Sequence, residues 1–446
     1  MLPRSPAFVA QRIEHLTTDQ KVGGSSPSKR TEKVAYASTP TSLDCGNSKI
    51  ILTQIHSEDN RVGLMTTNET YGRPLSPIID LSSAQAFPNS ESLKQVHSEK
   101  FRRHRYGRDS GHGALALEEE LEIWHPGFRA LTFRSGMAAL EALLQFAWAK
   151  FDTVAIQSEI YRKTEALVSG LQSIGHRNLT RVPMHSPKRE GEAGKRPQFI
   201  FAEFPSNPHF RLIDLNDEKF STITPKPFIA IDATMSGLGN LTTKLTDQVD
   251  VICYSLTKFI GGHNDIIGGV LFVKESDYEE LWALRSRMGN IISPLDAFLT
   301  SRSLKTFALR MKAHLSSAKI VLEYMESALS EKNISTYFYP GSGENKDQKK
   351  LVEDTLINGG SVLSFIPSLP RHIMAERLAN LRFIKIAPSF GSTDSLLEIC
   401  SLMTRPDATT EDLLKSGLEP NLMRLSIGID EPESIIRDLR NLLVTD

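Results

Sequence analysis

The chain has 446 residues, of which 40% are hydrophobic and 24% are charged, a composition typical of a globular protein with two or three domains. Its formal net charge of -1 provides no basic field, so we expect neither nucleic acid nor an anionic membrane as a partner. The sequence has no run of about 18 apolar residues, so we expect no transmembrane helix. The three cysteines, Cys45, Cys253 and Cys400, are odd in number and far apart, which indicates reduced thiols and a cytoplasmic location.

The first segment, residues 1–60, is rich in Ser, Thr and Pro and has no sustained period, which predicts a disordered N-terminal extension. Its stretch VAQRIEHLTTDQKVGGSSPS looks like the conceptual translation of a tRNA gene. Our hypothesis is that roughly the first thirty residues are a start-site artefact rather than a targeting segment. Residues 61–105 are then expected to form an N-terminal arm.

Helical and strand periods alternate in the next segment, residues 106–300. The apolar spacing of residues 114–125 and 137–151 predicts amphipathic helices. Short apolar runs, which predict strands, lie at residues 153–157, 198–204, 227–232 and 249–255. This alternation favours an α/β large domain whose mostly parallel sheet is covered by helices on both faces.

The last segment, residues 301–446, has a different character. Long helical patterns run through residues 296–329, and shorter strands are predicted at residues 361–367 and 422–429, with helices between them. We expect a smaller α+β C-terminal domain that packs on the first.

Three of the predicted strands end in polar residues. Glu203 ends one strand, Asp232 ends the next, and the sequence Ser255-Leu256-Thr257-Lys258 follows a third. Ligands of parallel α/β sheets bind beyond the carboxyl ends of the strands, so these residues should face one crevice.

Lys258 and Asp232 are the two residues in this crevice with the most chemical promise. A lysine that burial desolvates loses pKa, and its neutral amine can form a Schiff base with a carbonyl. The plain alternative is a lysine whose ammonium reaches water. Asp232 could cap the following helix, or it could hold a proton on a cationic partner such as a pyridinium nitrogen.

Three further residues have a functional and a plain interpretation. Gly136 precedes a predicted helix, whose free N–H groups suit a phosphate, although Ser-Gly before a helix is common. Tyr161 could stack on a planar ligand or pack half-buried. Arg424 could bind a carboxylate through its two-pronged guanidinium or lie on the surface. Together these residues match what pyridoxal phosphate requires: a Schiff-base lysine, a pyridinium partner, a phosphate seat and a stacking ring.

The sequence resembles the Cys/Met-metabolism family of pyridoxal-phosphate (PLP) enzymes over residues 74–442. Six motifs occur in the order and spacing of that family: FRSGMAAL, FAEFPSNP, YSLTKFIGGHNDIIGG, SPLDAFLTSRSLKTFALRMKAH, FGSTDSLLEICSLMTR and MRLSIGID. The resemblance implies the fold of a fold-type I PLP-dependent transferase. It implies pyridoxal phosphate as the cofactor and no metal.

The resemblance also implies a role for each matching residue. Lys258 would carry the cofactor and shuttle protons, Asp232 would pair with the pyridine nitrogen, and Tyr161 would stack on the ring and act in proton transfer. The phosphate would be held by Ser255, Thr257, Gly136 and Met137. Asn207 would lie near the phenolic oxygen of the cofactor.

Two residues in the resemblance concern the substrate and two concern a partner. Arg424, supported by Ser389, would bind the α-carboxylate of an amino-acid substrate. Tyr106 and Arg108 match a Tyr-x-Arg that reaches the phosphate from a neighbouring subunit. The resemblance therefore implies a homodimer or homotetramer with a shared active site.

The activity implied first is that of a transsulfuration enzyme similar to cystathionine γ-synthase, which replaces the acyl group of an O-acylhomoserine with the thiol of cysteine. A lyase that cleaves the C–S bond of cystathionine or methionine is the alternative, followed by an inactive homologue kept for binding or assembly. Arg162 and Lys163 stand where the family usually has Gly-Gly or Gly-Cys, and Ala233 replaces the family's Asn. The two cations could select an acidic substrate such as O-succinylhomoserine, or they could be solvated surface charge.

Overall fold

The structure is a computed structural model that describes residues 42–45, 48–51, 75–98, 106–173, 175, 179–182, 197–217, 220, 223–404, 407–415 and 417–444. Within the N-terminal segment, β1 (Ser42–Cys45) and β2 (Ser48–Ile51) pair antiparallel. The other residues of 1–60, including the stretch that resembles a translated tRNA gene, lie outside the described residues. The disorder and the start-site artefact therefore stay predictions.

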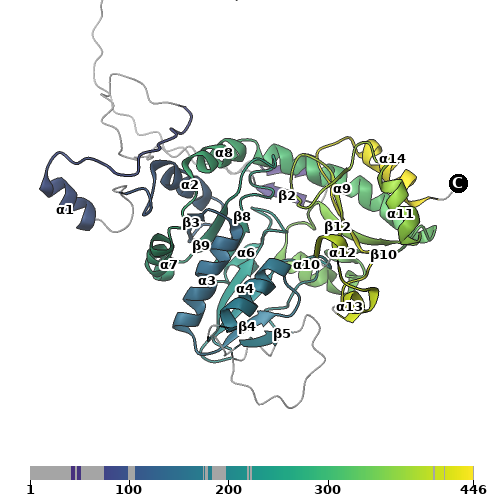
Figure 1. Ribbon diagram of the computed structural model, residues 1–446, viewed down its shortest axis with the longest axis horizontal. Helices are drawn as coiled ribbons and strands as arrows, with labels where there is room; N and C mark the ends of the chain where they lie inside the picture. The colour runs from purple at the N-terminus through teal and green to yellow at the C-terminus, as the bar shows by residue number, and fades with distance from the viewer. Residues whose placement is uncertain are drawn as a thin grey trace, which may run out of the picture.

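The first large feature is a seven-stranded sheet (Figure 1). Its order is β3 (Arg129–Phe133), β9 (Gly269–Val273), β8 (Val251–Ser255), β7 (Phe228–Asp232), β6 (Phe199–Glu203), β4 (Val154–Gln157) and β5 (Leu179–Val182). The pairs from β8 to β5 are all parallel, and β9 pairs antiparallel with both of its neighbours. The prediction of a mostly parallel sheet is confirmed.

Helices cover both faces of this sheet. Alternate residues of each strand therefore pack into two separate hydrophobic cores. On β8, Ile252 packs into one core, whereas Val251 and Cys253 pack into the other. Such two-sided burial explains why these strands are apolar without alternation. The helices of this part are α2 (His112–Glu122), α3 (Gly136–Lys150), α4 (Arg162–Ser173), α6 (Thr243–Thr246), α7 (Glu275–Met288) and α8 (Pro294–Leu304).

A second sheet of six strands follows in the chain and lies beside the first (Figure 1). Its order is β11 (Ser342–Gly343), β10 (Ile334–Tyr339), β12 (Val362–Pro367), β15 (Met423–Ser426), β14 (Leu396–Ile399) and β13 (Lys385–Ile386), and only β13 and β14 pair in parallel. Its helices are α9 (Phe307–Ser330), α10 (Lys349–Thr355), α11 (Arg371–Leu378), α12 (Cys400–Thr404), α13 (Thr410–Lys415) and α14 (Pro432–Leu443), with a 3-10 turn at Lys346–Gln348. This is the α+β arrangement that the sequence predicted.

The long helical pattern around residue 300 forms two helices rather than one. α8 ends at Leu304 and α9 begins at Phe307. At the break, the amide of Thr306 donates to the carbonyl of Ser303 in a tight turn. Because α8 spans residue 300, the predicted division between residues 106–300 and 301–446 would fall inside a helix, and it stays a prediction.

The N-terminal arm, of which residues 75–98 are described, carries α1 (Ser90–Ser98), which stands away from the rest of the molecule in Figure 1. Leu75 and Leu81 are 96% and 78% exposed. Among the described residues, no helix is long and apolar enough to cross a membrane. The same residues hold no group of three His, Cys, Asp or Glu side chains suited to a metal ion.

Candidate active site

The parallel pairing of β6, β7 and β8 brings the polar strand ends together, as the sequence predicted. Glu203 and Asp232 are direct partners in the register of β6 and β7, and Asp232 pairs with Cys253 of β8. Lys258 lies in the turn that follows β8, where its carbonyl accepts a hydrogen bond from the amide of Gly262 at 2.7 Å. Three segments that are distant in sequence therefore end at one edge of the sheet.

Lys258 is largely withdrawn from water. Its Nζ donates to Ser389 Oγ at 2.7 Å and lies 4.9 Å from the centre of the Phe390 ring. Burial, helped by the charge of Arg424 and opposed by that of Glu398, lowers the pKa of Lys258 to about 8. The neutral amine, which is the form that attacks a carbonyl, is therefore far more accessible near neutral pH than in an exposed lysine, although the ammonium still predominates below pH 8.

Asp232 ends β7 with one side of its carboxylate satisfied. Oδ1 accepts hydrogen bonds from the amide and the hydroxyl of Thr234, at 2.9 and 2.5 Å. Burial raises the pKa of Asp232, and the two hydrogen bonds oppose that rise. Nothing else in the described part of the chain hydrogen-bonds to this carboxylate, so Oδ2 is available to a cationic N–H donor.

Glu203 holds the backbone of Tyr161. Its Oε1 accepts from the Tyr161 amide at 2.5 Å, and its own amide donates to Gln157 Oε1 at 2.8 Å. Burial, followed by the nearby charge of Asp232, raises the pKa of Glu203 well above its usual value. The Tyr161 side chain is 43% exposed, so its ring has a face free for a planar ligand.

The beginning of α3 offers free N–H donors. Ser135 caps the helix by accepting from the amide of Ala138 at 3.0 Å. The amides of Gly136 and Met137 have no acceptor among the described residues. A Cβ on Gly136 would come within 3.1 Å of the Ser255 Cβ, so glycine is what lets the Ser255 hydroxyl approach these amides. This arrangement suits an anion.

Close contact between the main chain of Gly269 and that of residues 135–136 sets the position of this helix end. A Cβ on Gly269, the first residue of β9, would lie 2.4 Å from the carbonyl oxygen of Ser135 and 2.7 Å from the amide nitrogen of Gly136. No side chain fits there.

Thr257 stabilises the turn that carries Lys258, because its hydroxyl accepts a hydrogen bond from the amide of Gly268 at 3.1 Å.

Arg424 lies on β15 and is 6% exposed. Its guanidinium donates to Asn207 Oδ1 at 3.0 Å and to the carbonyl of Ser389 at 3.1 Å, and it forms an ion pair with Glu398 at 3.0 Å. Its Nε is buried and has no acceptor in the described part of the molecule. Because a buried donor without an acceptor is costly, Arg424 is prepared for one more oxygen ligand.

Tyr106 and Arg108 lie apart from this cluster. They contact each other, with the Arg108 guanidinium 5.0 Å from the centre of the Tyr106 ring, and Tyr106 is 43% exposed. Arg108 also lies beside Gly289, at the end of α7. Within one chain these residues contact neither Lys258 nor Asp232 among the described contacts.

Sequence reasoning missed two parts of this site: the Glu398 partner of Arg424, and the histidine His209, which lies between Glu159 and Glu419. Glu398 falls inside a recognised motif, so an acidic residue there could have been paired with the arginine. His209 follows Asn207-Pro208, and no local pattern connects it with residues so distant in the chain.

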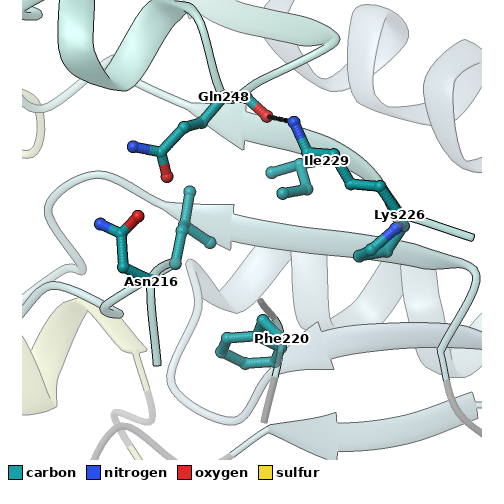
Figure 2. Close-up of a pocket in the computed structure, with 7 residues that line it drawn as sticks. Asn216, Phe220, Lys226, Ile229 and Gln248 are labelled. Carbon is teal, nitrogen blue, oxygen red and sulfur yellow. Dashed lines mark hydrogen bonds between the residues drawn. The ribbon is translucent and has the colours of Figure 1, made fainter. Parts of the chain in front are cut away.

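A cavity of about 270 Å³ lies elsewhere (Figure 2). It is at the amino ends of β7 and β8, where Lys226 Nζ donates to the carbonyl of Gln248 at 3.0 Å. Its lining residues are Leu215, Asn216, Phe220, Lys226, Pro227, Ile229 and Gln248. None of the predicted site residues belongs to it, and the candidate active site is at the opposite ends of the same strands.

The donors present at the candidate site fit pyridoxal phosphate. Two free amides and a hydroxyl suit its phosphate, an open carboxylate oxygen suits its pyridine nitrogen, and a desolvated lysine suits its aldehyde. Together with the two sheets, these features define a fold-type I PLP-dependent enzyme.

Comparison with known proteins identifies the family. The family model described as Cys/Met metabolism PLP-dependent enzyme matches residues 62–444, so the chain belongs to this family. It is a pyridoxal-phosphate-dependent enzyme of cysteine and methionine metabolism, as the sequence motifs implied, and its cofactor is pyridoxal phosphate.

Individual relatives are distant and carry several names. The chain is 25% identical over 383 residues to cystathionine beta-lyase of Lactococcus lactis subsp. cremoris, covering 85% of this chain and 97% of the relative. It is 29% identical over 340 residues to cystathionine gamma-synthase of Mycobacterium leprae (strain TN), covering 76% and 86%. Its fold is similar to that of cystathionine gamma synthase from Xanthomonas oryzae pv. oryzae in complex with aminoacrylate and cysteine, with a TM-score of 0.72, 26% identity, and coverage of 82% of this chain and 92% of the other.

Proposed function

We propose that this enzyme catalyses γ-replacement: it takes an O-acylhomoserine, releases the acyl group as a carboxylic acid, and joins the thiol of cysteine to the γ-carbon. The observation that supports an amino-acid substrate is the place of Ser389. Its hydroxyl meets Lys258 Nζ at 2.7 Å, and its carbonyl meets Arg424 at 3.1 Å. A substrate α-carboxylate bound at Arg424 would therefore have its α-carbon beside the amine of Lys258.

Besides Lys258, whose amine would bind the aldehyde, five groups of the chain hold the cofactor in this proposal. The amides of Gly136 and Met137, with the Ser255 hydroxyl, bind the phosphate, and Asp232 keeps the ring nitrogen protonated. Tyr161 covers one face of the ring. Pyridoxal phosphate, when bound, supplies an electron sink that stabilises negative charge on the carbons of the substrate.

The remaining residues act on the substrate. Arg424 binds the α-carboxylate with Ser389, and Asn207 orients the guanidinium by accepting one of its N–H groups. Lys258 removes the α-proton and returns protons during the later steps, a role that its lowered pKa favours. Ser389 accepts a hydrogen bond from Lys258 Nζ and so restrains the amine between its proton transfers.

A C–S lyase is the second candidate, because the same residues serve both reactions until the γ-substituent has left. Named relatives support each reaction: the similarity to a gamma-synthase of Mycobacterium leprae favours the first, and cystathionine gamma-lyase of Bacillus subtilis (strain 168), 28% identical over 386 residues, favours the second. Arg162 and Lys163 favour γ-replacement on an acidic substrate such as O-succinylhomoserine. Both side chains are exposed at the first turn of α4, directly after Tyr161.

We also propose that the active site is completed by a second copy of the chain, in a homodimer or homotetramer in the cytoplasm. Tyr106 and Arg108 are exposed and follow the N-terminal arm. Four apolar side chains of that arm are exposed as well: Leu75, Ile78, Ile79 and Leu81. A row of exposed apolar side chains is typical of an interface, and a partner subunit would bring the Arg108 cation to the phosphate.

Product analysis by mass spectrometry tests the reaction. Purified, cofactor-loaded protein receives O-succinylhomoserine and cysteine in one reaction and cystathionine in another. We expect cystathionine to form in the first reaction, with release of succinate. Loss of cystathionine in the second, with a keto acid appearing and no synthesis in the first, would replace the proposal with the lyase.

A further inference from the structure

His209 lies in the loop that follows β6, and both of its ring nitrogens face carboxylates. Nδ1 pairs with Glu159, and Nε2 lies 3.1 Å from an oxygen of Glu419. A ring that donates from both nitrogens is an imidazolium cation. Burial lowers the pKa of His209, but the hydrogen bonds and charges of Glu159 and Glu419 outweigh it and raise this pKa to about 9. His209 is therefore positively charged at neutral pH.

The two carboxylates belong to different halves of the candidate active site. Glu159 follows β4 and stands two residues before Tyr161, whose ring is proposed to cover the cofactor. Glu419 belongs to the segment that leads into β15, five residues before Arg424. His209 itself comes two residues after Asn207, which accepts a hydrogen bond from Arg424. One side chain thus connects the segments that carry Tyr161 and Arg424.

The surroundings of His209 restrict its position. Its ring packs edge-on against Phe338 of β10, with centroids 4.9 Å apart, and its carbonyl accepts from Asn345 Nδ2 at 2.7 Å. Ser206 Oγ donates to the second oxygen of Glu159 at 3.3 Å. On the same loop, Arg211 pairs with Asp347 of the 3-10 turn at 2.7 Å, and the carboxylate of Asp214 accepts from the amide of Asn216 at 2.9 Å.

We propose that His209 is a positioning residue, which holds the Tyr161 segment and the Arg424 strand at a fixed separation so that a substrate carboxylate bound at Arg424 has its α-carbon beside the amine of Lys258. This inference rests on the substrate role proposed for Arg424. His209 touches neither substrate nor cofactor. Its two ion pairs act across the junction of the two sheets, where Asn207 already joins the loop to Arg424.

The test compares His209→Gln with the wild-type holoenzyme. Glutamine keeps one hydrogen bond but carries no charge. We expect KM for the amino-acid substrate to rise about tenfold and kcat to change less than about threefold. Glu419→Gln should show the same split between KM and kcat. The double variant should be hardly worse than His209→Gln alone, because the two changes break one interaction.

The pH dependence separates positioning from general packing. Below about pH 9 the wild-type imidazolium is charged, and above it the ion pairs are lost. The ratio of KM between His209→Gln and wild type should therefore be largest near pH 7 and approach one above pH 9. Taking this ratio cancels the titration of Lys258, which both proteins share.

Arg211→Gln is the matched control. It removes another ion pair of the same loop, the one with Asp347, together with a hydrogen bond to Asn345 Oδ1 at 3.2 Å, and it leaves the pairs of His209 with Glu159 and Glu419 in place. Its melting temperature should fall about as much as that of His209→Gln, while its KM stays at the wild-type value. An equal rise of KM in both variants would show that any weakening of the loop has this effect, and that outcome would overturn the inference.

A binding measurement keeps the inference apart from the identity of the reaction. Glycine, which carries an α-carboxylate but no leaving group, is titrated into the holoenzyme while the absorbance of the cofactor is followed. We expect its dissociation constant to rise about tenfold in His209→Gln. Equal binding by variant and wild type overturns the inference alone. Failure of the wild type to bind glycine or any homoserine ester overturns the role of Arg424 and the inference together.

Discussion

The first turn of α3 and the middle of β15 both contribute to the candidate site, but they differ in whether their polar groups already have hydrogen-bond partners within the protein. The amides of Gly136 and Met137 are left without acceptors in the described structure. Arg424, in contrast, already contacts Asn207, Ser389 and Glu398. In the proposed function a resident phosphate satisfies the donors at α3, so the protein needs no substitute for it. The substrate proposed to bind Arg424 comes and goes, so this side chain needs partners during every turnover.

This difference separates two kinds of binding. In the proposed function, the end of the site at α3 is complementary to a resident phosphate and is incomplete without it. The proposed substrate end is organised before a substrate arrives, and within the Arg424 guanidinium the buried Nε is the nitrogen that lacks an acceptor among the described residues. Preorganised charges need no rearrangement when the ligand binds. Substitutions should therefore affect the two ends differently, and Lys258, which lies between them, should matter to both.

The largest expected effect is that of Lys258→Ala. The variant loses the amine that we propose carries the cofactor and moves the α-proton, so kcat should fall by about 10²- to 10⁴-fold, the range of a positioned acid–base group. Steady-state turnover with the substrate identified by mass spectrometry is the measurement. Lys274→Ala, which removes a lysine paired with Asp250 at 3.2 Å, is the control and should retain wild-type turnover. Full activity of Lys258→Ala would contradict the proposed role of Lys258 and, with it, the proposed reaction.

Arg424→Lys should affect the substrate end alone. A lysine cannot contact Asn207, Ser389 and a carboxylate together, because it lacks the planar fork of the guanidinium. Loss of one or two charge-assisted hydrogen bonds predicts a rise in KM of about 10- to 100-fold. The affinity for pyridoxal phosphate, measured by equilibrium dialysis, should not change.

Arg437→Lys, on α14, serves as the control for the same chemical change. If Arg424→Lys loses affinity for the cofactor as much as for the substrate, the two ends of the site do not act independently.

The pKa of Lys258 predicts how the stability of the cofactor-free protein depends on pH. Its pKa is about 8 in the folded protein and about 10.5 when unperturbed. Below pH 8 the lysine is protonated in both states, and burying the cation costs about 3 kcal/mol. Between pH 8 and 10.5 the unfolded state binds more protons, so stability rises with pH and the cost disappears.

Lys258→Met, which has no titratable group, isolates this effect. The cofactor-free variant should be more stable than wild type at pH 7, and the difference should vanish near pH 10.5. Urea unfolding at both values measures it, and His209, which titrates in both proteins, cancels in the comparison. A difference that stays constant with pH would mean that the ammonium reaches water in the folded protein.

The smallest expected effect concerns the exposed cations after Tyr161. Changing both Arg162 and Lys163 to glutamine should raise KM for O-succinylhomoserine about two- to fivefold, since exposed charges contribute little. KM for O-acetylhomoserine, which has no distal carboxylate, should not change. The effect should weaken in high salt. An equal change of KM for both substrates would mean that these cations do not recognise the distal carboxylate. They would then be solvated surface charge, the alternative that the sequence left open.

The sequence predicted the parts of the site that depend on local patterns. The apolar runs that end at Asp232 and before Lys258 identify strands, and parallel strands align their carboxyl ends, so these two residues could be placed together without coordinates. The helix after Gly136 follows from apolar spacing in the same way. These predictions need only the period of one element and the geometry of a sheet.

The remaining contacts depend on packing between distant segments. Glu398 reaches Arg424 because β14 and β15 are antiparallel neighbours with these two residues in register. His209 meets Glu419 across 210 positions of the chain. Nothing in the local sequence specifies which carboxylate a buried cation will meet, because strand pairing within one sheet makes that choice for Arg424 and the packing of distant segments makes it for His209.

Gly269 carries a consequence for how this site tolerates change. Its Cα faces the Ser135 carbonyl and the Gly136 amide with no room for a methyl group, so the spacing between β9 and the beginning of α3 is set by main-chain atoms alone. Side chains around the site can be exchanged over evolutionary time without altering that spacing. The main-chain part of the proposed phosphate seat is thus fixed independently of the surrounding side chains, whereas around Arg424 and Tyr161 side chains set the geometry.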